Sequence, residues 1–281
     1  MSEGFLARVR AQMPALGRAE QAVAQVILDD PEQVVESSST QLAQMSGTSR
    51  PTVVRTCQSL GLSGYQQLRV LLARESALAS AAPEPDPDSG ALGSVVAHFH
   101  HVAAGIEDMT ALLTGDLIET AVDGLARARR LVVVGHGVSA PLAWDTATRL
   151  TTLGRLAEHQ ADVMQEQIVL TGLTDSDMAL VLSGSGTNSL SLAAARTAHD
   201  AGATVLAVTA FSHSPLAECA DTLLVTGMRT PSFRDEVVQT SRIPQVILLE
   251  ALVPLVARRL GTTARDAKVR ALDVVSRFVE E

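Results

Sequence analysis

A stretch of alternating prolines and acidic residues divides the chain into two parts with different sequence patterns. Residues 79–93 read ASAAPEPDPDSGALG. Proline removes backbone donors and favours an extended path, and like charges repel each other, so we expect a semi-rigid spacer. Before it the apolar pattern is helical, whereas after it short Val/Leu-rich runs alternate with helical stretches, which is typical of βαβ units. We therefore predict a helical domain over residues 1–79, a linker over 80–92 and an α/β domain over 93–281.

Length, charge and cysteine content limit what such a chain can do. The 281 residues exceed the usual size of one domain, and the net charge of -9 argues against coating nucleic acid or anionic membrane with the whole surface. Residues 46–75 nevertheless hold four arginines and one acidic residue, so any DNA contact would be local. Cys57 and Cys219 lie far apart, and no apolar run is long enough for a signal peptide or a membrane span. A reducing cytoplasm is the expected location.

The first domain contains two helices joined by a tight glycine turn. One helix is expected to begin after Ser39, which can cap it, and to stop at Gly47, which allows a left-handed turn. Ser49 can cap the next helix, and Gly61 closes it. Helix, short turn and helix in this order predict a helix-turn-helix, within an all-α domain.

The second of these helices has an apolar and a polar side. Val53, Cys57 and Leu60 form an inward stripe, and we expect one arginine and three hydroxyl side chains on the opposite side. Guanidinium and hydroxyl groups reach phosphates and base edges in a major groove, although an ordinary solvated helix face would look the same. With the start of the helix included, the candidate DNA contacts are Ser49, Arg50, Thr52, Arg55, Thr56 and Ser59.

Several short motifs follow one another between residues 16 and 73. They are Ala-Glu-Gln before the first helix core, the Asp-Pro-Glu that ends this helix, Leu42-Ala43, Thr48-Ser49, Thr52-Val53-Val54-Arg55, Leu60-Gly61 and Gly64-Tyr65. In this order they resemble the DNA-binding domain of the RpiR family of bacterial regulators, which implies binding to double-stranded operator DNA. Thr56 and Tyr65 stand where the family often has phenylalanine, and Pro51 where it often has a small residue. These departures concern the base preference rather than the fold.

Two glycine- and serine-rich loops follow short aliphatic runs in the second domain. The run 131–134 leads into Gly-His-Gly-Val-Ser, and the run 178–182 leads into Ser-Gly-Ser-Gly-Thr-Asn. Glycine lets the backbone approach a ligand, a helix start offers unpaired N–H groups, and serine adds a neutral donor. Because parallel strands end at the same edge of a sheet, both loops should face one crevice. This chemistry suits a phosphate group.

The two loops together resemble the sugar isomerase (SIS) domain of phosphosugar isomerases and RpiR regulators, over roughly residues 93–259. The resemblance implies a mainly parallel sheet between helices, in a Rossmann-type three-layer fold, and a phosphosugar ligand. The family pattern after the second strand is Ser-x-Ser-Gly-x-Thr, and here Asn188 replaces the threonine; its amide can still donate. Glu236 and Arg242 resemble the segment that closes over the sugar in the enzymes, but they could equally be surface charges. The candidate ligand residues are Gly137, Ser139, Ser183, Gly184, Ser185, Asn188 and Glu236.

We expect no metal and no cofactor. His98, His100 and His101 form a cluster, but only the first and last share a helix face, and no nearby thiolate or carboxylate completes a metal site. His136 in the first loop could contact the ligand or cap the loop.

The favoured interpretation is a transcriptional regulator, not an enzyme, whose second domain senses a phosphorylated sugar and controls genes of sugar uptake or catabolism. A phosphosugar isomerase is one alternative, with Glu236 and His213 as possible acid and base. A dinucleotide (NAD)-sensing repressor is another, because residues 135–140 satisfy G-x-G-x-x-[GA] and Glu158 follows near the ribose position. That alternative leaves the second loop unexplained.

We also expect a homodimer or homotetramer. One short recognition helix makes too few contacts for operator specificity, whereas two copies on half-sites one helical turn apart make enough. The apolar segment 246–256 and the helix expected over 95–113 are the predicted interface.

Overall fold

In the computed structural model the described residues are 5–79, 90–227 and 241–279, and their contacts divide them into two units. The division falls between Ser94 and Val95. It lies near the predicted linker, although the helix after the linker already begins at Gly90.

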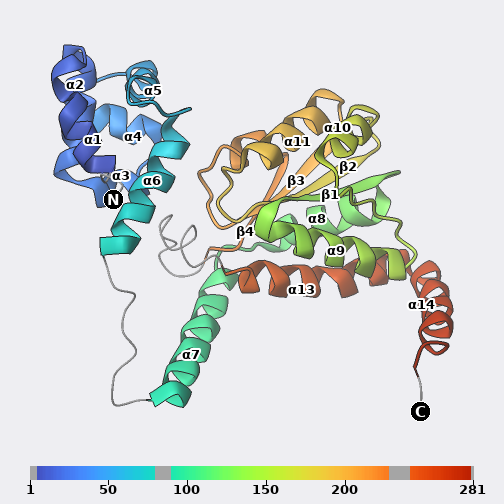
Figure 1. The fold of residues 1–281 in the computed structure, drawn as a ribbon. Helices are drawn as coiled ribbons and strands as arrows, with labels where there is room; N and C mark the ends of the chain where they lie inside the picture. Colours follow the sequence, from blue (N-terminus) through green and yellow to red (C-terminus); the bar gives the residue numbers. More distant parts are fainter. Residues whose placement is uncertain (1–4, 80–89, 228–240, 280–281) are drawn as a thin grey trace. The chain divides into compact units, whose positions relative to one another are not determined.

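The first unit is all-helical in its described part (Figure 1), as expected. Its core consists of aliphatic side chains at helical spacing, among them Val23 and Ile27 of one helix and Val53 and Cys57 of another, all four fully buried. Tyr65 ties two further helices together, because its hydroxyl lies 2.9 Å from two carbonyl oxygens of the segment 34–37. The helices are α1 (Phe5–Gln12), α2 (Arg18–Asp29), α3 (Pro31–Glu36), α4 (Ser39–Met45), α5 (Arg50–Ser59) and α6 (Tyr65–Ala79).

The predicted helix-turn-helix corresponds to α4 and α5. The cap of α4 differs from the prediction by one residue: Ser38 rather than Ser39 accepts the backbone N–H of Gln41, and the Gln41 side chain accepts from the N–H of Ser38. This reciprocal pair satisfies two amides at once, which a cap at the next serine would not do. Gly47 has φ of 61°, which confirms the left-handed turn between the helices.

The second unit is built on a parallel sheet with strand order β1-β2-β3-β4, as predicted for an α/β domain. Both faces of the strands are buried, which explains their continuous aliphatic sequences. Gly135, the last residue of the first strand, lies opposite Leu182, the last of the second, so the two loops that follow leave the sheet side by side. The strands are β1 (Leu131–Gly135), β2 (Met178–Leu182), β3 (Thr204–Thr209) and β4 (Thr222–Val225).

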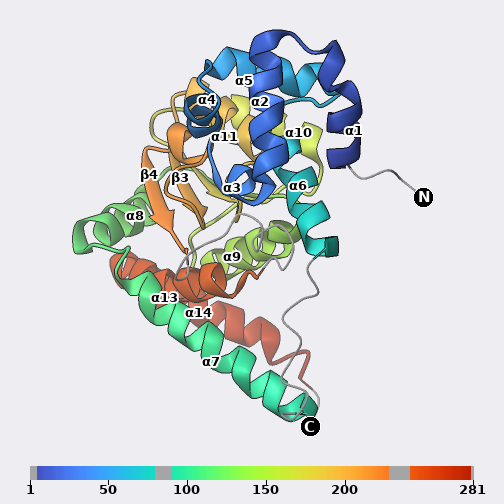
Figure 2. The same ribbon diagram turned by 90° about the vertical axis from the view of Figure 1, so that its left-hand side faces the viewer.

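Helices cover both faces of this sheet (Figures 1 and 2). Leu131 and Val133 of β1 pack into one apolar cluster with α8 (Gly115–Arg127), α9 (Ala140–Thr152) and α13 (Ile243–Leu260). Val132 and Val134 pack into the other cluster with α10 (Val163–Thr171) and α11 (Ser189–Asp200). The unit also contains α7 (Gly90–Thr110) and α14 (Thr262–Val275). The three-layer architecture predicted from the resemblance is confirmed.

Asp177 fixes the start of β2 from inside the protein. Its carboxylate accepts hydrogen bonds from the Arg129 guanidinium at 2.7 Å, the Arg130 N–H at 2.9 Å, and both the N–H and the hydroxyl of Thr174 at 2.7 and 2.9 Å. Burial by itself would raise the pKa of Asp177, but these hydrogen bonds outweigh it and hold the pKa below its usual value.

We therefore expect Asp177→Asn to lower the free energy of unfolding at neutral pH by roughly 2 to 4 kcal/mol, because the amide nitrogen cannot accept the one bond made at Oδ1 or the three made at Oδ2, whichever oxygen it replaces. A carboxyl group with a lowered folded pKa stabilises the protein above its unfolded pKa, and this contribution is lost as the pH falls through the folded pKa. The wild type should thus lose stability below about pH 4, and the variant should lose less. Urea titrations at several pH values measure this, with exposed Asp175→Asn as control; identical pH profiles would contradict it.

Candidate functional sites

The exposed side of α5 is narrower than the sequence suggests. Arg55 and Ser59 are exposed as predicted, and Arg50 is exposed at the first turn. Gln58 is also exposed on this side, although the sequence analysis did not select it; its position three residues after Arg55 was the available signal. Ser49 is the N-cap, and its hydroxyl accepts from the N–H of Thr52 at 3.4 Å.

Thr52 and Thr56 do not lie on the exposed side, so this part of the prediction is wrong. Thr52 is 7% exposed and Thr56 is fully buried. The hydroxyl of Thr56 donates to the carbonyl oxygen of Thr52 at 2.9 Å. Because that bond satisfies the hydroxyl within the helix, the remaining methyl-bearing side chain packs in the core like a small aliphatic residue.

Glu20 of α2 organises the exposed side of α5. Its carboxylate accepts from the Ser59 hydroxyl at 2.8 Å and from the N–H of Gly17 at 2.9 Å, and it lies 4.0 Å from the Arg55 guanidinium. The bond from Gly17, followed by that from Ser59, lowers the pKa of Glu20. Glu20 therefore holds the Ser59 hydroxyl and lies beside Arg55 on the exposed side of α5.

The first loop of the α/β unit turns sharply between β1 and α9. A Cβ on Gly135 would lie 2.7 Å from the carbonyl oxygen of Ser139 and 2.9 Å from Cβ of Ala143, so only glycine fits there. Gly137 has φ of 57°, and Ser139 is buried at the end of the short 3-10 turn before α9. The backbone thus brings a serine hydroxyl to the carboxyl end of β1.

The second loop is fixed to the end of β3. The carbonyl oxygen of Gly184 accepts from the N–H of Ala210 and the hydroxyl of Thr209, both at 2.9 Å. The Ser185 hydroxyl accepts from the Thr187 hydroxyl at 3.0 Å, and Ser183 is buried at the end of β2. Thr209 escaped the sequence analysis, because it belongs to a strand 25 residues further along the chain.

Asn188 caps α11 with its side-chain oxygen, which accepts from the N–H groups of Leu190 at 3.0 Å and Ser191 at 3.1 Å. Its NH2 group is left as the possible donor to a ligand. In the described part of the chain, the backbone N–H groups of Ser185, Asn188 and Ser189 have no hydrogen-bond partner. These amides lie at the positive end of the helix dipole, which is the chemistry that anions favour.

His136 neither caps its loop nor extends into solvent. Its ring lies between two buried residues: Nδ1 is 3.1 Å from the Ser191 hydroxyl, and Nε2 is 3.1 Å from a carboxylate oxygen of Glu166 in α10. The sequence could not indicate this contact, because the partners are 55 and 30 residues away.

Glu158 does not fit the dinucleotide alternative. Its carboxylate forms a two-pronged ion pair with Arg130, at 2.9 and 3.0 Å, and its backbone pairs with Val132 in the first half of β1. A ribose-binding carboxylate would have to be free at the carboxyl end of the sheet.

Four further predictions concern residues or sites away from the loops. Glu236 lies outside the described residues, and His213 is exposed with Nδ1 2.9 Å from the Ser212 hydroxyl. Within the described ranges, no group of three His, Cys, Asp or Glu side chains could hold a metal ion. No helix in those ranges is long and apolar enough to cross a membrane.

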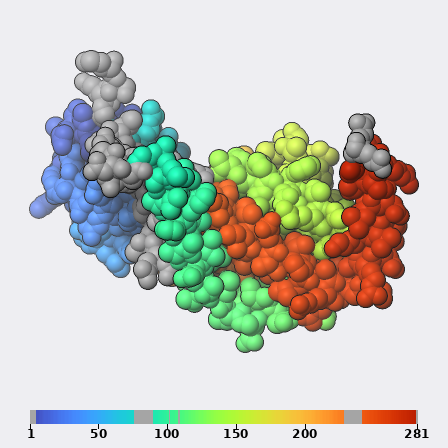
Figure 3. Space-filling view, turned by 90° about the horizontal axis from the view of Figure 1, so that it is seen from below, coloured from blue at the N-terminus to red at the C-terminus, as the bar shows by residue number. Residues whose placement is uncertain are grey.

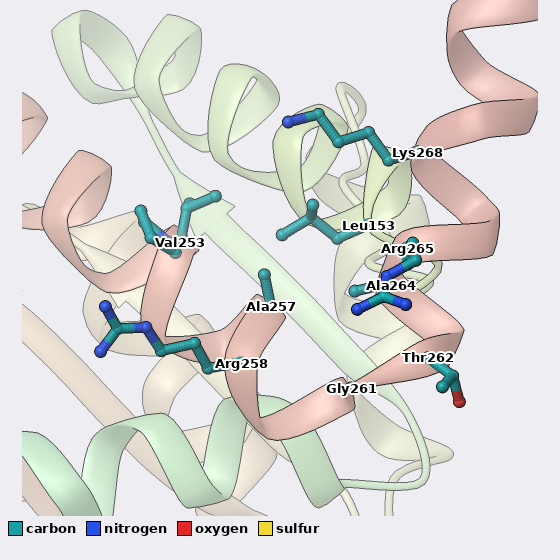
Figure 4. Close-up of a pocket in the computed structure, with 10 residues that line it drawn as sticks. Leu153, Val253, Ala257, Arg258, Gly261, Thr262, Ala264, Arg265 and Lys268 are labelled. Carbon is teal, nitrogen blue, oxygen red and sulfur yellow. The ribbon is translucent and has the colours of Figure 1, made fainter.

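A separate groove lies between α13, α14 and the end of α9 (Figure 4), with a cavity volume of about 680 Å³. Leu153 and Ala257 form its apolar floor, and Arg258, Arg265 and Lys268 are among its lining residues. Leu153 follows the end of α9, about 20 Å along the helix from Ser139, so the groove does not belong to the loop crevice.

The geometry defines a class: a helix-turn-helix unit followed by an α/β unit with glycine- and serine-rich loops at the carboxyl ends of its first two strands. The chain matches the rpiR-family helix-turn-helix domain over residues 3–79 and the SIS domain over residues 124–253. It is 32% identical over 262 residues to the HTH-type transcriptional regulator HexR of Pseudomonas aeruginosa, covering 92% of this chain and 91% of that protein. The chain therefore belongs to the RpiR family of HTH-type transcriptional regulators with a SIS domain.

Solved structures show the same folds. The Vibrio vulnificus NanR protein complexed with ManNAc-6P has a TM-score of 0.75 at 23% identity, over 99% of this chain and 100% of that one. The sugar isomerase domain of an RpiR transcription factor from Sphaerobacter thermophilus has a TM-score of 0.56 at 25% identity, over 64% of this chain and 97% of that one.

Proposed function

We propose that this regulator binds operator DNA through α5 and that a phosphorylated sugar, bound at the two loops of its SIS domain, modulates this binding in the cytoplasm. The observation that carries the proposal is the pair of loops at the neighbouring carboxyl ends of β1 and β2. They carry Ser139 and Ser183, which are both buried, and the partly exposed Ser185, with Gly137, Gly184 and Asn188 in the same loops.

Neutral donors at a helix start suit a phosphate group, since they stabilise its charge without placing a fixed cation in the site. The solved structure of NanR, which shares the fold, is a complex with ManNAc-6P, and this supports a phosphosugar as the class of effector. Regulation of genes for sugar uptake or catabolism follows as the proposed role. The decisive experiment is a gel-shift titration with sugar phosphates and the corresponding free sugars, and only the phosphates should change DNA binding.

For the DNA-binding unit, we expect Arg55→Ala to weaken operator binding by roughly 1 to 3 kcal/mol if Arg55 contacts a base, or to lower the salt dependence by about one unit if it contacts a phosphate. The side chain of Arg55 is 65% exposed and pairs only loosely with Glu20, so the melting temperature should hardly change. Fluorescence anisotropy with labelled operator at several salt concentrations separates the two roles.

Thr56→Val is the matched control for Arg55→Ala. It removes a buried hydroxyl one residue away, so it should leave DNA affinity unchanged and act only on stability. Unfolding of the domain by Arg55→Ala, or unchanged binding, would contradict the assignment of this side of α5.

We further propose that the regulator is an oligomer. The segment 246–256 is a poorer interface than predicted, because Leu248, Leu249, Leu252 and Val256 pack into the core of their own unit. Exposed apolar side chains lie on α7, which is the second predicted segment and where Phe99 is 65% exposed, and also on α14, whose surface is visible in Figure 3.

On α14 these side chains are Val269, Leu272, Val274 and Val275, at 52–57% exposure, and Phe278 and Val279 follow the helix at 82% and 69%. Such apolar stripes are typical of surfaces that a second copy covers. We expect light scattering at micromolar concentration to give at least a dimer, and Leu272→Glu to shift it toward the monomer, whereas Arg270→Glu on the same helix should not. A monomeric wild type that binds operator fully would contradict this.

A further inference from the structure

A continuous set of polar contacts connects the two ligand loops beneath the surface. The side-chain oxygen of Asn188, at the end of the second loop, accepts from the N–H of Ser191. The hydroxyl of Ser191 contacts Nδ1 of His136 in the first loop, and Nε2 of His136 contacts Glu166. Both ring nitrogens of His136 are thus engaged, and the contacts join the first loop to α11 and α10.

The members of this set are buried more deeply than polar groups usually are. Ser191 and Glu166 are each 1% exposed, and the side chain of His136 is 9% exposed. The 3.1 Å contact between His136 and Glu166 is an ion-pair approach rather than an aligned hydrogen bond, since neither atom has a hydrogen-bond partner in the described chain. The second carboxylate oxygen of Glu166 also has none there.

A buried carboxyl group whose oxygens have no hydrogen-bond partner in the described chain is costly for stability, and removal of the imidazole beside it would be costlier still. No arginine or lysine of the described chain lies within ion-pair distance of Glu166, so His136 is its partner. Apolar side chains at these positions would stabilise the fold equally well. Stability alone therefore does not explain why these side chains are polar, whereas their position against both loops suggests a role in the function of the loops.

We propose that His136 is a positioning residue for the phosphate site, held in place by Glu166 and Ser191 so that the two loops form one preformed cradle. This inference rests on the proposed function. Ser191 is the third residue of α11, so a fixed Ser191 orients the first helical turn, where the free N–H groups of Asn188 and Ser189 lie. Donors set in place before binding lose less entropy when the phosphate arrives.

The burial of Ser191 excludes a different use of the same three residues. A serine, a histidine and a carboxylate in contact would suit nucleophilic catalysis, but a nucleophile must be accessible to its substrate. Ser191 is 1% exposed inside α11, so it acts on the ligand only through the helix that it holds.

The test uses the full-length protein and inorganic phosphate as the probe, with affinity measured by titration calorimetry and stability by thermal unfolding. His136→Phe keeps an aromatic ring but leaves the buried carboxyl group of Glu166 without the imidazole beside it, so it should lower both stability and affinity. The informative protein is the double variant His136→Phe/Glu166→Gln, in which a neutral amide replaces this carboxyl group. The melting temperature of the double variant should return most of the way to that of the wild type. The double variant should still bind phosphate about tenfold more weakly than the wild type.

Ser191→Ala should by itself weaken phosphate binding by a similar factor, and it should add little once His136→Phe is present, because both changes break the same connection. Thr197→Val is the matched control. The Thr197 hydroxyl also joins α11 to α10, by a 2.7 Å hydrogen bond to Gln167, but it lies two turns away from the loops. This control should lower stability without changing phosphate affinity.

The results of these titrations distinguish a wrong role for His136 from a wrong phosphate site. If wild-type protein does not bind phosphate, the phosphate site itself is wrong, and the inference is overturned with it. If the wild type binds phosphate and the stable double variant binds it equally well, the proposed function stands and the role of His136 is overturned. Recovered stability with weakened binding supports the positioning role, because a purely structural contribution would be restored together with the melting temperature.

Discussion

The double variant Ser183→Ala/Ser185→Ala should bind its sugar phosphate more weakly by roughly two to three orders of magnitude. A hydrogen bond to a charged group contributes about 1.5 to 3 kcal/mol, and we take about 3 to 4 kcal/mol as the combined loss. Ser183 lies buried at the end of β2, while Ser185 also accepts the hydroxyl of Thr187. The change at Ser185 should therefore loosen the loop as well as remove a donor.

DNA binding by the effector-free double variant should equal that of the wild type, and its response to effector should disappear. A ligand shifts a regulator only through its different affinity for the two states. A gel-shift titration with a panel of sugar phosphates and free sugars measures both properties. Ser176→Ala, exposed before the amino end of β2, is the control and should respond normally. A double variant that responds at wild-type effector concentrations would rule out the phosphate-binding role of these serines.

Gly186→Ala should be among the most damaging single substitutions in the α/β unit. Gly186 has φ of 63°, and a Cβ at this position would lie 2.6 Å from Cβ of Ser214 and 2.9 Å from the hydroxyl oxygen of Thr209. The left-handed conformation costs roughly 1 to 2 kcal/mol for a residue with a side chain. The overlap adds about 1 to 3 kcal/mol and displaces the loop, so effector binding should be lost too.

The variant Gly137→Ala separates the cost of the left-handed conformation from the cost of steric overlap. Its φ of 57° is nearly the same, but a Cβ would meet no atom within 4 Å. We expect it to lower the free energy of unfolding by the conformational cost alone, about 1 to 2 kcal/mol. Urea unfolding of both variants measures the difference. Equal losses for the two glycines would show that the neighbours of Gly186 move aside at little cost, against the prediction.

Some features of the DNA-binding unit can be predicted from neighbouring residues in the sequence, and others cannot. The stop at Gly47 and the cap at Ser49 depend on residues within one turn, so the sequence predicts them. The burial of Thr56 depends instead on which helices pack against α5, and on a hydroxyl that bonds within its own helix. A threonine can lie on the buried or on the exposed side of a helix, so the residue type alone does not decide whether Thr56 is buried.

In the α/β unit the sequence by itself determined the strands, the loops after them and the kind of ligand they suit. Two-sided burial imposes continuous aliphatic runs on β1 and β2, and the loop chemistry is local. Only the tertiary structure decided the surroundings of His136, the pairing of Glu158 with Arg130 and the clash that requires Gly186. Each of these involves partners 23 to 55 residues away, which the packing of helices on the sheet brings together, and local sequence patterns do not indicate contacts over such separations.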